Sequence, residues 1–186
     1  VLEGDERSTV MRNNALDYAK QNFDGARIKR FQLEMKRFLE KYEMSAVRTS
    51  RLFPETLSTL RQLKALGCCI GLVTNTSKKA VADYFSMCTL GSYFDVTVTR
   101  NHVSKLKPDP EGVLLALKEL GKKHFFLVGD LEHDAIAARK AGGVSIIVNR
   151  DSSRLPRFKA DFFVKSLSEV PAIVSSDTRR EPFAER

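Results

Sequence analysis

Short apolar runs alternate with amphipathic stretches along this chain from residue 52 onward. The alternation covers most of the chain after residue 52. Its mainly apolar runs lie at 68–73, 94–98, 125–128, 144–148 and 162–164. Such an order is typical of strands and helices that wind into one parallel sheet with helices on both faces. The sequence therefore predicts an α/β fold, and residues 51–174 form its core.

Proline and glycine mark where the helices between these runs begin and end. Pro54 stands at one predicted helix start and Gly67 just past its end, while Gly121 ends a helix that starts at Pro110. The run at 68–73 that follows Gly67 has no polar alternation, which predicts a strand buried on both faces. This run contains Cys68 and Cys69, and the chain has a third cysteine, Cys88. Their spacing matches neither a disulfide framework nor a metal site, so all three are predicted to be buried thiols.

Residues 1–50 carry two helical patterns and no strand pattern, which predicts a small helical module beside the core. Apolar residues recur at three- and four-residue steps in the second helix: Ile28, Phe31, Met35, Phe38 and Tyr42. The opposite face is basic, and the whole chain has a formal net charge of +8. Because aromatic residues are not interleaved with these charges, a solvated face is favoured and a nucleic-acid surface is unlikely.

Other features bound the setting of the protein. No apolar run approaches the roughly 18 residues that would span a membrane, and nothing near Val1 reads as a signal peptide. We therefore expect a soluble cytoplasmic protein with no membrane partner, whose oligomeric state the sequence does not indicate. Residues 175–186 are expected to form a polar tail.

Thr74 and Asn75 directly follow the apolar run at 68–73. A hydroxyl, a side-chain amide and free backbone amides at a helix N-terminus can bind phosphate oxygens. The alternative is that the hydroxyl serves only as a helix cap.

The segment at 107–110 reads Lys-Pro-Asp-Pro, so that two prolines stiffen the loop behind Lys107. A fixed ammonium group in a dry cleft supplies compact positive charge for a phosphate. A rigid turn with a solvated lysine remains the alternative.

The run at 125–128 leads into Gly129 and Asp130, and Asp134 follows within one helical turn. Two carboxylates at the carboxyl end of a buried strand suit Mg²⁺, which takes a few carboxylate oxygens together with water and a phosphate. Acidic residues that are favoured by a helix macrodipole are the alternative. His133 lies inside this turn and is predicted to be a surface residue of the helix.

Taken in order, these motifs resemble those of the haloacid dehalogenase-like superfamily of phosphohydrolases, particularly the phosphoglycolate phosphatase-like branch with a helical cap. The resemblance covers about residues 51–170 and implies a Rossmann-like sheet with residues 1–50 as the cap. It implies that Thr74 binds the transferring phosphoryl group and that Lys107 steadies its charge. It also implies that Asp130, with Asp134 less directly, holds Mg²⁺.

The resemblance implies a phosphomonoesterase that hydrolyses a small phosphorylated metabolite with Mg²⁺, and a cap that excludes water and selects the substrate. One alternative is a non-catalytic module that keeps the phosphate pocket without turnover. A basic protein associated with nucleic acid is a further one.

The strand that carries Asp-x-Asp in this family has no counterpart here, and Asp5 is a poor substitute for its nucleophile. In the family that strand lies between the strands that end here at Thr74 and Asp130. Its loss would leave buried backbone groups unpaired, at roughly 1–3 kcal/mol each. Three explanations remain: a fragment of a longer product, strands that have closed ranks, or another segment in the slot. We favour the fragment, which would be inactive by itself.

Overall fold

A computed structural model describes residues 3–151 and 156–177 of the chain. The helices are α1 (Glu3–Asn22), α2 (Gly25–Thr49), α3 (Thr56–Ala65), α4 (Lys78–Met87), α5 (Glu111–Leu120), α6 (Glu132–Lys140) and α7 (Val170–Ser176). The strands are β1 (Gly71–Val73), β2 (Val96–Val98), β3 (Phe126–Gly129), β4 (Val144–Val148) and β5 (Phe162–Val164). Short 3₁₀ turns lie at η1 (Gly91–Tyr93), η2 (Arg100–His102) and η3 (Leu167–Glu169).

All strand pairs in the described residues are parallel, and they form two separate sheets. One sheet has the order β1-β2 and the other has the order β3-β4-β5. Within the described chain, β1 and β3 do not pair with each other. The strands have therefore not closed ranks, and each of β1 and β3 has one edge with no described strand beside it.

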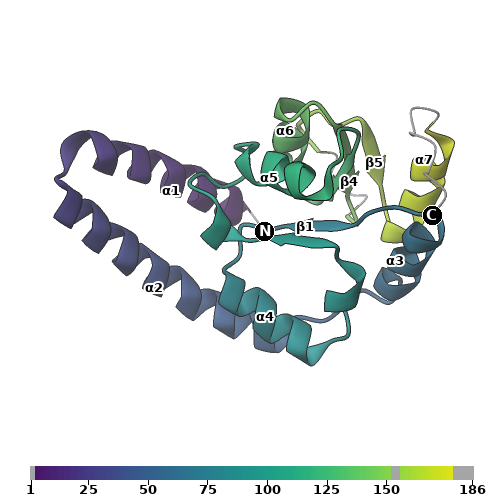
Figure 1. The fold of residues 1–186 in the computed structure, drawn as a ribbon, viewed down its shortest axis with the longest axis horizontal. Coiled ribbons are helices and arrows are strands. Elements are labelled where there is room, and N and C mark those ends of the chain that lie inside the picture. Colours follow the sequence, from purple (N-terminus) through teal and green to yellow (C-terminus); the bar gives the residue numbers. More distant parts are fainter. Residues whose placement is uncertain (1–2, 152–155, 178–186) are drawn as a thin grey trace.

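Helices cover these sheets on both sides, as the alternating pattern predicted. Helix α5 packs on β1 and β2, while α6 packs on β3 and β4. Figure 1 shows α4 and α5 on opposite sides of β1, with α3 and α7 together at the end away from the α1–α2 hairpin. The α/β, Rossmann-like architecture is confirmed.

Local signals explain how the hairpin and the core helices begin and end. Asp24 lies between α1 and α2 and accepts a hydrogen bond of 2.8 Å from the N–H of Arg27, so it caps α2. Ser77 caps α4 in the same way through the N–H of Ala80. Gly121 ends α5 with a φ of 62°, a left-handed conformation that glycine adopts without a steric cost.

Each sheet has its own hydrophobic cluster. Ile146 and Val164 of the larger sheet pack with Val170 and Val174 of α7. In the smaller sheet, Val96 and Val98 pack against Ala116 of α5. Burial of a valine or isoleucine side chain stabilises the fold by roughly 1.5–3 kcal/mol, so both clusters contribute.

The prediction of a fully buried strand at 68–73 is wrong. Strand β1 begins only at Gly71, which is exposed, and its other residues are half-buried. Cys69 is exposed and Cys68 and Cys88 are half-buried, so the prediction of buried thiols fails as well. The physical reason is that β1 pairs on one side only, which leaves this segment more open than a central strand.

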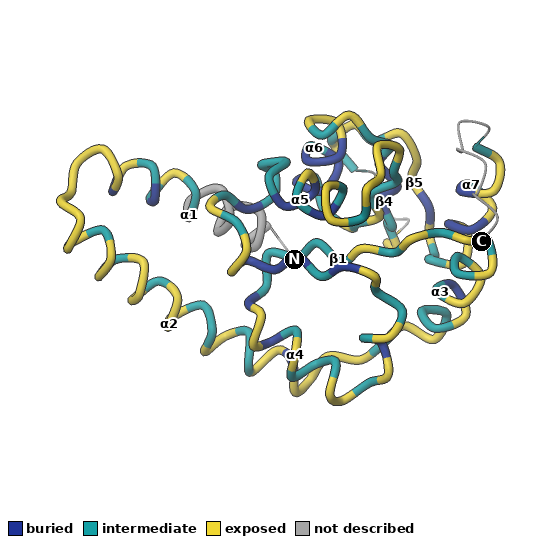
Figure 2. Tube along the Cα trace, viewed as in Figure 1, coloured by how far each residue is buried: buried dark blue, intermediate teal, exposed yellow. Residues whose placement is uncertain are grey.

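The α1–α2 hairpin projects from the core, and most of its outer surface is exposed (Figure 2). The predicted apolar stripe on α2 is not buried along its whole length, because Phe38 is 60% exposed and Tyr42 is 62% exposed. Their rings pack against each other instead, with centroids 4.9 Å apart. The basic residues of the opposite face are exposed as expected: Arg27, Lys29, Arg30, Lys36, Arg37 and Lys41.

Two further expectations concern the ends of the chain and the membrane. Of the predicted polar tail at 175–186, Ser175 and Ser176 belong to α7 instead. Residues 178–186 lie outside the described structure, and so does the side chain of Asp5. Among the described helices, none combines the length and the apolar character needed to cross a bilayer.

Candidate active site

The predicted site residues lie where strands of both sheets end. Thr74 and Asn75 follow β1, Asp130 follows β3, and Asp134 lies in the first turn of α6. Lys107 lies on the loop between β2 and α5. Parallel strands bring their carboxyl ends to one edge of a sheet, where ligands of α/β proteins bind.

The ammonium group of Lys107 connects the two sheets. Its Nζ donates a hydrogen bond of 2.9 Å to the carbonyl oxygen of Val73, the last residue of β1. The same Nζ lies 2.7 Å from Oδ1 of Asp134, and the two side chains are 12% and 4% exposed. The alternative of a solvated lysine is therefore wrong, because Lys107 forms a nearly buried ion pair across the split between the sheets.

Two asparagine side chains hold the backbone next to this lysine. The carboxamide of Asn75 accepts from the N–H of Lys107 at 3.0 Å and donates to its carbonyl oxygen at 3.2 Å. The carboxamide of Asn13 makes the same pair of bonds with Leu106, at 3.2 and 3.0 Å. Asn13 was missed by sequence reasoning, since a single asparagine on a polar helix gives no signal of a contact 93 residues away.

Thr74 occupies the turn at the end of β1. Its backbone N–H donates to the carbonyl oxygen of Val98 at 2.9 Å, which extends the pairing of β1 and β2 by one residue. Its hydroxyl oxygen accepts from the N–H of Thr76 at 3.1 Å. Because Ser77 caps α4, the alternative that Thr74 is the helix cap does not hold.

Asp134 organises the acidic turn from within. Its Oδ2 accepts from the N–H groups of Asp130 and Leu131, both at 3.2 Å, and its Oδ1 faces Lys107. A Cβ atom at Gly129 would lie 2.3 Å from the Asp134 carboxyl, so only glycine leaves room for this approach. Both oxygens of Asp134 thus have protein partners, which fits an indirect role at a metal site.

Asp130 is the more open of the two carboxylates. Partial burial of its carboxyl group, followed by the negative charge of Asp134, raises its pKa above the ordinary value. A divalent cation would relieve the repulsion that raises this pKa, and hard carboxylate oxygens are the ligands that Mg²⁺ prefers. Within residues 3–151 and 156–177, no group of three or more His, Cys, Asp or Glu residues could hold a metal ion. The open carboxylate of Asp130 fits one ligand of such a cation, whose other ligands would come from water, substrate or elsewhere.

His133 does not lie on the helix surface as predicted. It is 8% exposed, and its Nδ1 has no hydrogen-bond partner among the described atoms. Its Nε2 is 3.9 Å from Oδ1 of Asp134, too far for a hydrogen bond. The histidine packs behind the acidic turn.

A second nearly buried ion pair joins the hairpin to the core, and no local pattern in the sequence indicates it. The guanidinium of Arg100 pairs with both carboxylate oxygens of Glu43, with Nη2 3.2 Å from Oε2. The Arg100 and Glu43 side chains are 7% and 17% exposed. Glu43 also accepts from the N–H of Ser77 at 3.3 Å, so α2 is fixed to the start of α4.

Comparisons with known proteins identify the family of this chain. The family described as haloacid dehalogenase-like hydrolase matches residues 4–148. The pyrophosphatase PpaX of Bacillus cereus strain AH820 is 32% identical over 126 residues, which cover 65% of this chain and 58% of that protein. The pyrophosphatase PpaX of Bacillus pumilus is 33% identical over 131 residues, 67% of this chain and 60% of that protein. The chain therefore spans less than two thirds of the length of these relatives.

Two solved structures have the same fold. A HAD phosphatase from Thermococcus onnurineus superposes with a TM-score of 0.67 at 24% identity, over 89% of this chain and 87% of that one. A predicted phosphoglycolate phosphatase from Haemophilus somnus superposes with a TM-score of 0.61 at 22% identity, over 86% of this chain and 74% of that one.

Proposed function

The chain belongs to the haloacid dehalogenase-like hydrolase family. From this premise we propose that it functions as a Mg²⁺-dependent phosphomonoesterase, which hydrolyses a small phosphorylated metabolite. The observation that carries the proposal is the ammonium of Lys107, which joins the end of β1 to Asp134 beside the open carboxylate of Asp130. A cation, a carboxylate and the hydroxyl of Thr74 near the carboxyl ends of β1 and β3 are the groups that we expect to serve phosphoryl transfer.

Each residue has a definite task in this proposal. An ammonium group has three N–H donors, and Val73 and Asp134 take two of those of Lys107, which leaves one for a phosphate oxygen. The hydroxyl group of Thr74 accepts from the N–H of Thr76, and its own O–H supplies a neutral donor to the same phosphoryl group. Asp130 holds Mg²⁺, with Asp134 as the carboxylate that fixes the turn and the lysine. A bound Mg²⁺ would neutralise charge on the phosphoryl oxygens.

We infer that the carboxylate nucleophile of this family is not among the described residues of the site. We place it on a strand that pairs between β1 and β3, and the edges of those two strands without a described partner support this placement. Without such a strand, Lys107, Thr74 and Asp130 bind a phosphoryl group but form no aspartyl-phosphate. Residues 1–50 act as the lid over this edge.

The names of the relatives agree with a small phosphorylated substrate. One group is named for pyrophosphate and one solved structure is described as a predicted phosphoglycolate phosphatase. Both substrates are small anions, and the basic charge of this chain favours their approach.

Hydrolysis of p-nitrophenyl phosphate with Mg²⁺ tests the proposal, with this polypeptide measured beside a version that carries the coding sequence upstream of Val1. We expect turnover only in the longer version, and its loss by more than a hundredfold in Lys107→Met. The matched control is Lys105→Met, because Lys105 lies on the same loop with a 44% exposed side chain.

The second candidate is a phosphate-binding module without turnover, which the geometry of Lys107 also allows. Inorganic phosphate binding, measured by calorimetry, separates the two. Binding that requires Lys107 without turnover in either version would favour the module. Absence of both binding and turnover would refute the two candidates together.

A further inference from the structure

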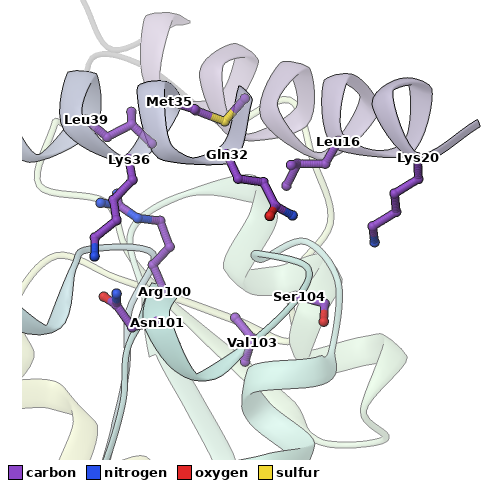
Figure 3. A pocket seen from close by; sticks show the side chains of 10 residues that line it. All are labelled: Leu16, Lys20, Gln32, Met35, Lys36, Leu39, Arg100, Asn101, Val103 and Ser104. Atoms are coloured by element: carbon purple, nitrogen blue, oxygen red, sulfur yellow. The ribbon is translucent and has the colours of Figure 1, made fainter. Parts of the chain in front are cut away.

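A cavity of about 310 Å³ lies between the α1–α2 hairpin and the loop that follows β2. Figure 3 shows hairpin side chains on one side of it and residues of the loop at 100–104 on the other. Four apolar side chains contribute to its wall: Leu16, Met35, Leu39 and Val103. At about 30 Å³ for each water molecule, the cavity has room for roughly ten of them. This is the lower end of the size range of small-molecule sites, about 300–1,000 Å³.

Polar contacts pin the hairpin to the core on two sides of this cavity. Glu43 of α2 binds Arg100, and Asn13 of α1 binds the backbone of Leu106. Asp17 adds an ion pair with Lys105, at 3.4 Å. The gap between these contacts is therefore held open by the fold and is not a loose hinge, so a ligand would meet a largely formed site.

The polar groups of the lining share one chemical character. Among the described residues that line the cavity there is no aspartate or glutamate, whereas Lys20 and Lys36 both line it. Lys20 has no ion pair in the described part of the chain, and Lys36 has only a 3.9 Å approach to Glu40. The charge of Arg100, by contrast, is already matched by Glu43. Lys20, with no ion pair to a described residue, and Lys36, with only a long one to Glu40, thus give the lining an excess of positive charge.

Neutral donors complete this lining. Asn101 accepts a hydrogen bond of 2.9 Å from the N–H of Lys78 through its Oδ1, which directs its Nδ2 donor elsewhere. The side chains of Gln32 and Ser104 make no hydrogen bond with another described residue. Figure 3 shows Gln32 extending from α2 toward the loop that carries Val103 and Ser104. The cavity therefore offers donors of hydrogen bonds beside an apolar wall.

We propose that this cavity binds a small organic anion that has an apolar body and one carboxylate or phosphonate-like group. The apolar body packs against Leu16, Met35 and Val103. The anionic group lies near Lys36, which Figure 3 shows at the end of the cavity beside Arg100 and Asn101, while Lys20 adds positive charge at the opposite end. None of the strand-end residues Thr74, Lys107 and Asp130 lines the cavity, so this binding does not depend on the proposed phosphatase activity. A ligand here would contact both the hairpin and the core, and would stabilise their present arrangement.

Equilibrium binding to the polypeptide tests the proposal with three probes of similar shape: benzoate, phenylphosphonate and the neutral benzamide. We expect saturable binding of at least one anion, at least tenfold tighter than that of benzamide. The double variant Lys20→Glu/Lys36→Glu should weaken anion binding at least tenfold. The matched control is Lys29→Glu/Lys41→Glu, which changes the net charge equally on exposed positions of α2 outside the cavity.

Several outcomes would overturn the assignment. These are an absence of saturable anion binding, equal binding of benzamide, or equal losses in the cavity variant and its control. A preference for benzoate over phenylphosphonate identifies a carboxylate ligand, and the reverse identifies a phosphate-type ligand. Gln32→Leu is the second variant, because it removes a neutral donor without a change of charge. Loss of phenylphosphonate binding in Lys107→Met, with binding intact in the cavity variant, would instead place that anion at the strand edge and refute the cavity.

Discussion

The two sheets of this protein differ in strand length and in how deeply their side chains are buried. The sheet β3-β4-β5 has Ile146 and Ile147 at 0% and 1% exposure and shares a cluster with α7. The sheet β1-β2 has two strands of three residues each, and β1 has no buried residue. The larger sheet therefore resembles a normal core, whereas the smaller one depends on α5 and on the loops at its end. The contact between Lys107 and Asp134 links the two sheets at the candidate active site, so the stability of both sheets is expected to depend on this ion pair.

The largest effect is expected where the two sheets are joined. Lys107→Met leaves the carboxylate of Asp134 nearly buried beside an apolar chain, and loss of one partner of a buried pair costs roughly 3–5 kcal/mol. Urea unfolding measures this loss. The double variant Lys107→Met/Asp134→Asn should recover part of it, because the unpaired charge is removed. A loss below about 1 kcal/mol in the single variant would show that the pair does not join the sheets energetically.

The two hydrophobic clusters should respond unequally to loss of packing. Ile146→Ala is expected to cost about 2–5 kcal/mol, because the side chain is fully buried. Val98→Ala removes fewer atoms and should cost about 2 kcal/mol. Amide hydrogen exchange of β2 and β4 distinguishes local from global effects. If each variant lowers the protection of its own sheet only, the halves open separately; equal loss in both sheets would contradict the contrast.

A smaller effect is expected at the contact between hairpin and loop. Asn13→Ala removes both hydrogen bonds to the backbone of Leu106 and should cost about 1–3 kcal/mol, nearer the lower value because the site is only half-buried. Asn14→Ala is the control, since Asn14 is exposed and lies beside it on α1. Thermal unfolding compares the two. Equal shifts would mean that Asn13 does not hold the loop of Lys107.

The smallest effect concerns the pKa of Asp130, which burial and then Asp134 raise. The folded state then binds more protons than the unfolded state, so stability falls as pH rises from about 3.9, the ordinary pKa of aspartate, through the raised folded pKa. Asp130→Asn removes this loss and should be the more stable protein at neutral pH without metal. The difference in Tm between Asp130→Asn and the unchanged protein should shrink as the pH is lowered toward 4. At neutral pH, addition of Mg²⁺ should also shrink it. An advantage for Asp130→Asn that does not depend on pH would rule out the titration of Asp130 as its cause.

Sequence reasoning could find the strands and their ends because periodicity and glycine are local signals. It placed Thr74 and Asp130 directly after strands, where the structure has them, whereas Lys107 lies on the loop before α5 and Asp134 in the first turn of α6. The contacts of these residues could not be predicted in the same way. Both carboxylate oxygens of Asp134 have partners within the protein, and the partner Lys107 is brought there by the path of the loop after β2. The roles of these residues in binding metal and phosphate stay predictions.

Contacts between distant segments gave no sequence signal at all. Glu43 and Arg100 are 57 residues apart, and nothing in either local pattern indicates that they pair. The exposure of Cys69 was missed for a related reason, since an apolar run looks the same whether its strand is central or pairs on one side only.

The edges of β1 and β3 that have no described strand partner also affect how strongly this polypeptide self-associates in solution. Backbone N–H and C=O groups along such an edge are a template for strands of other molecules, and Val128 beside one of them is 37% exposed. The net charge of +8 keeps molecules apart at low ionic strength, and salt screens that repulsion. Solutions of this chain should therefore scatter more light as salt and protein concentration rise together, and a peptide able to pair with these edges should restore clarity.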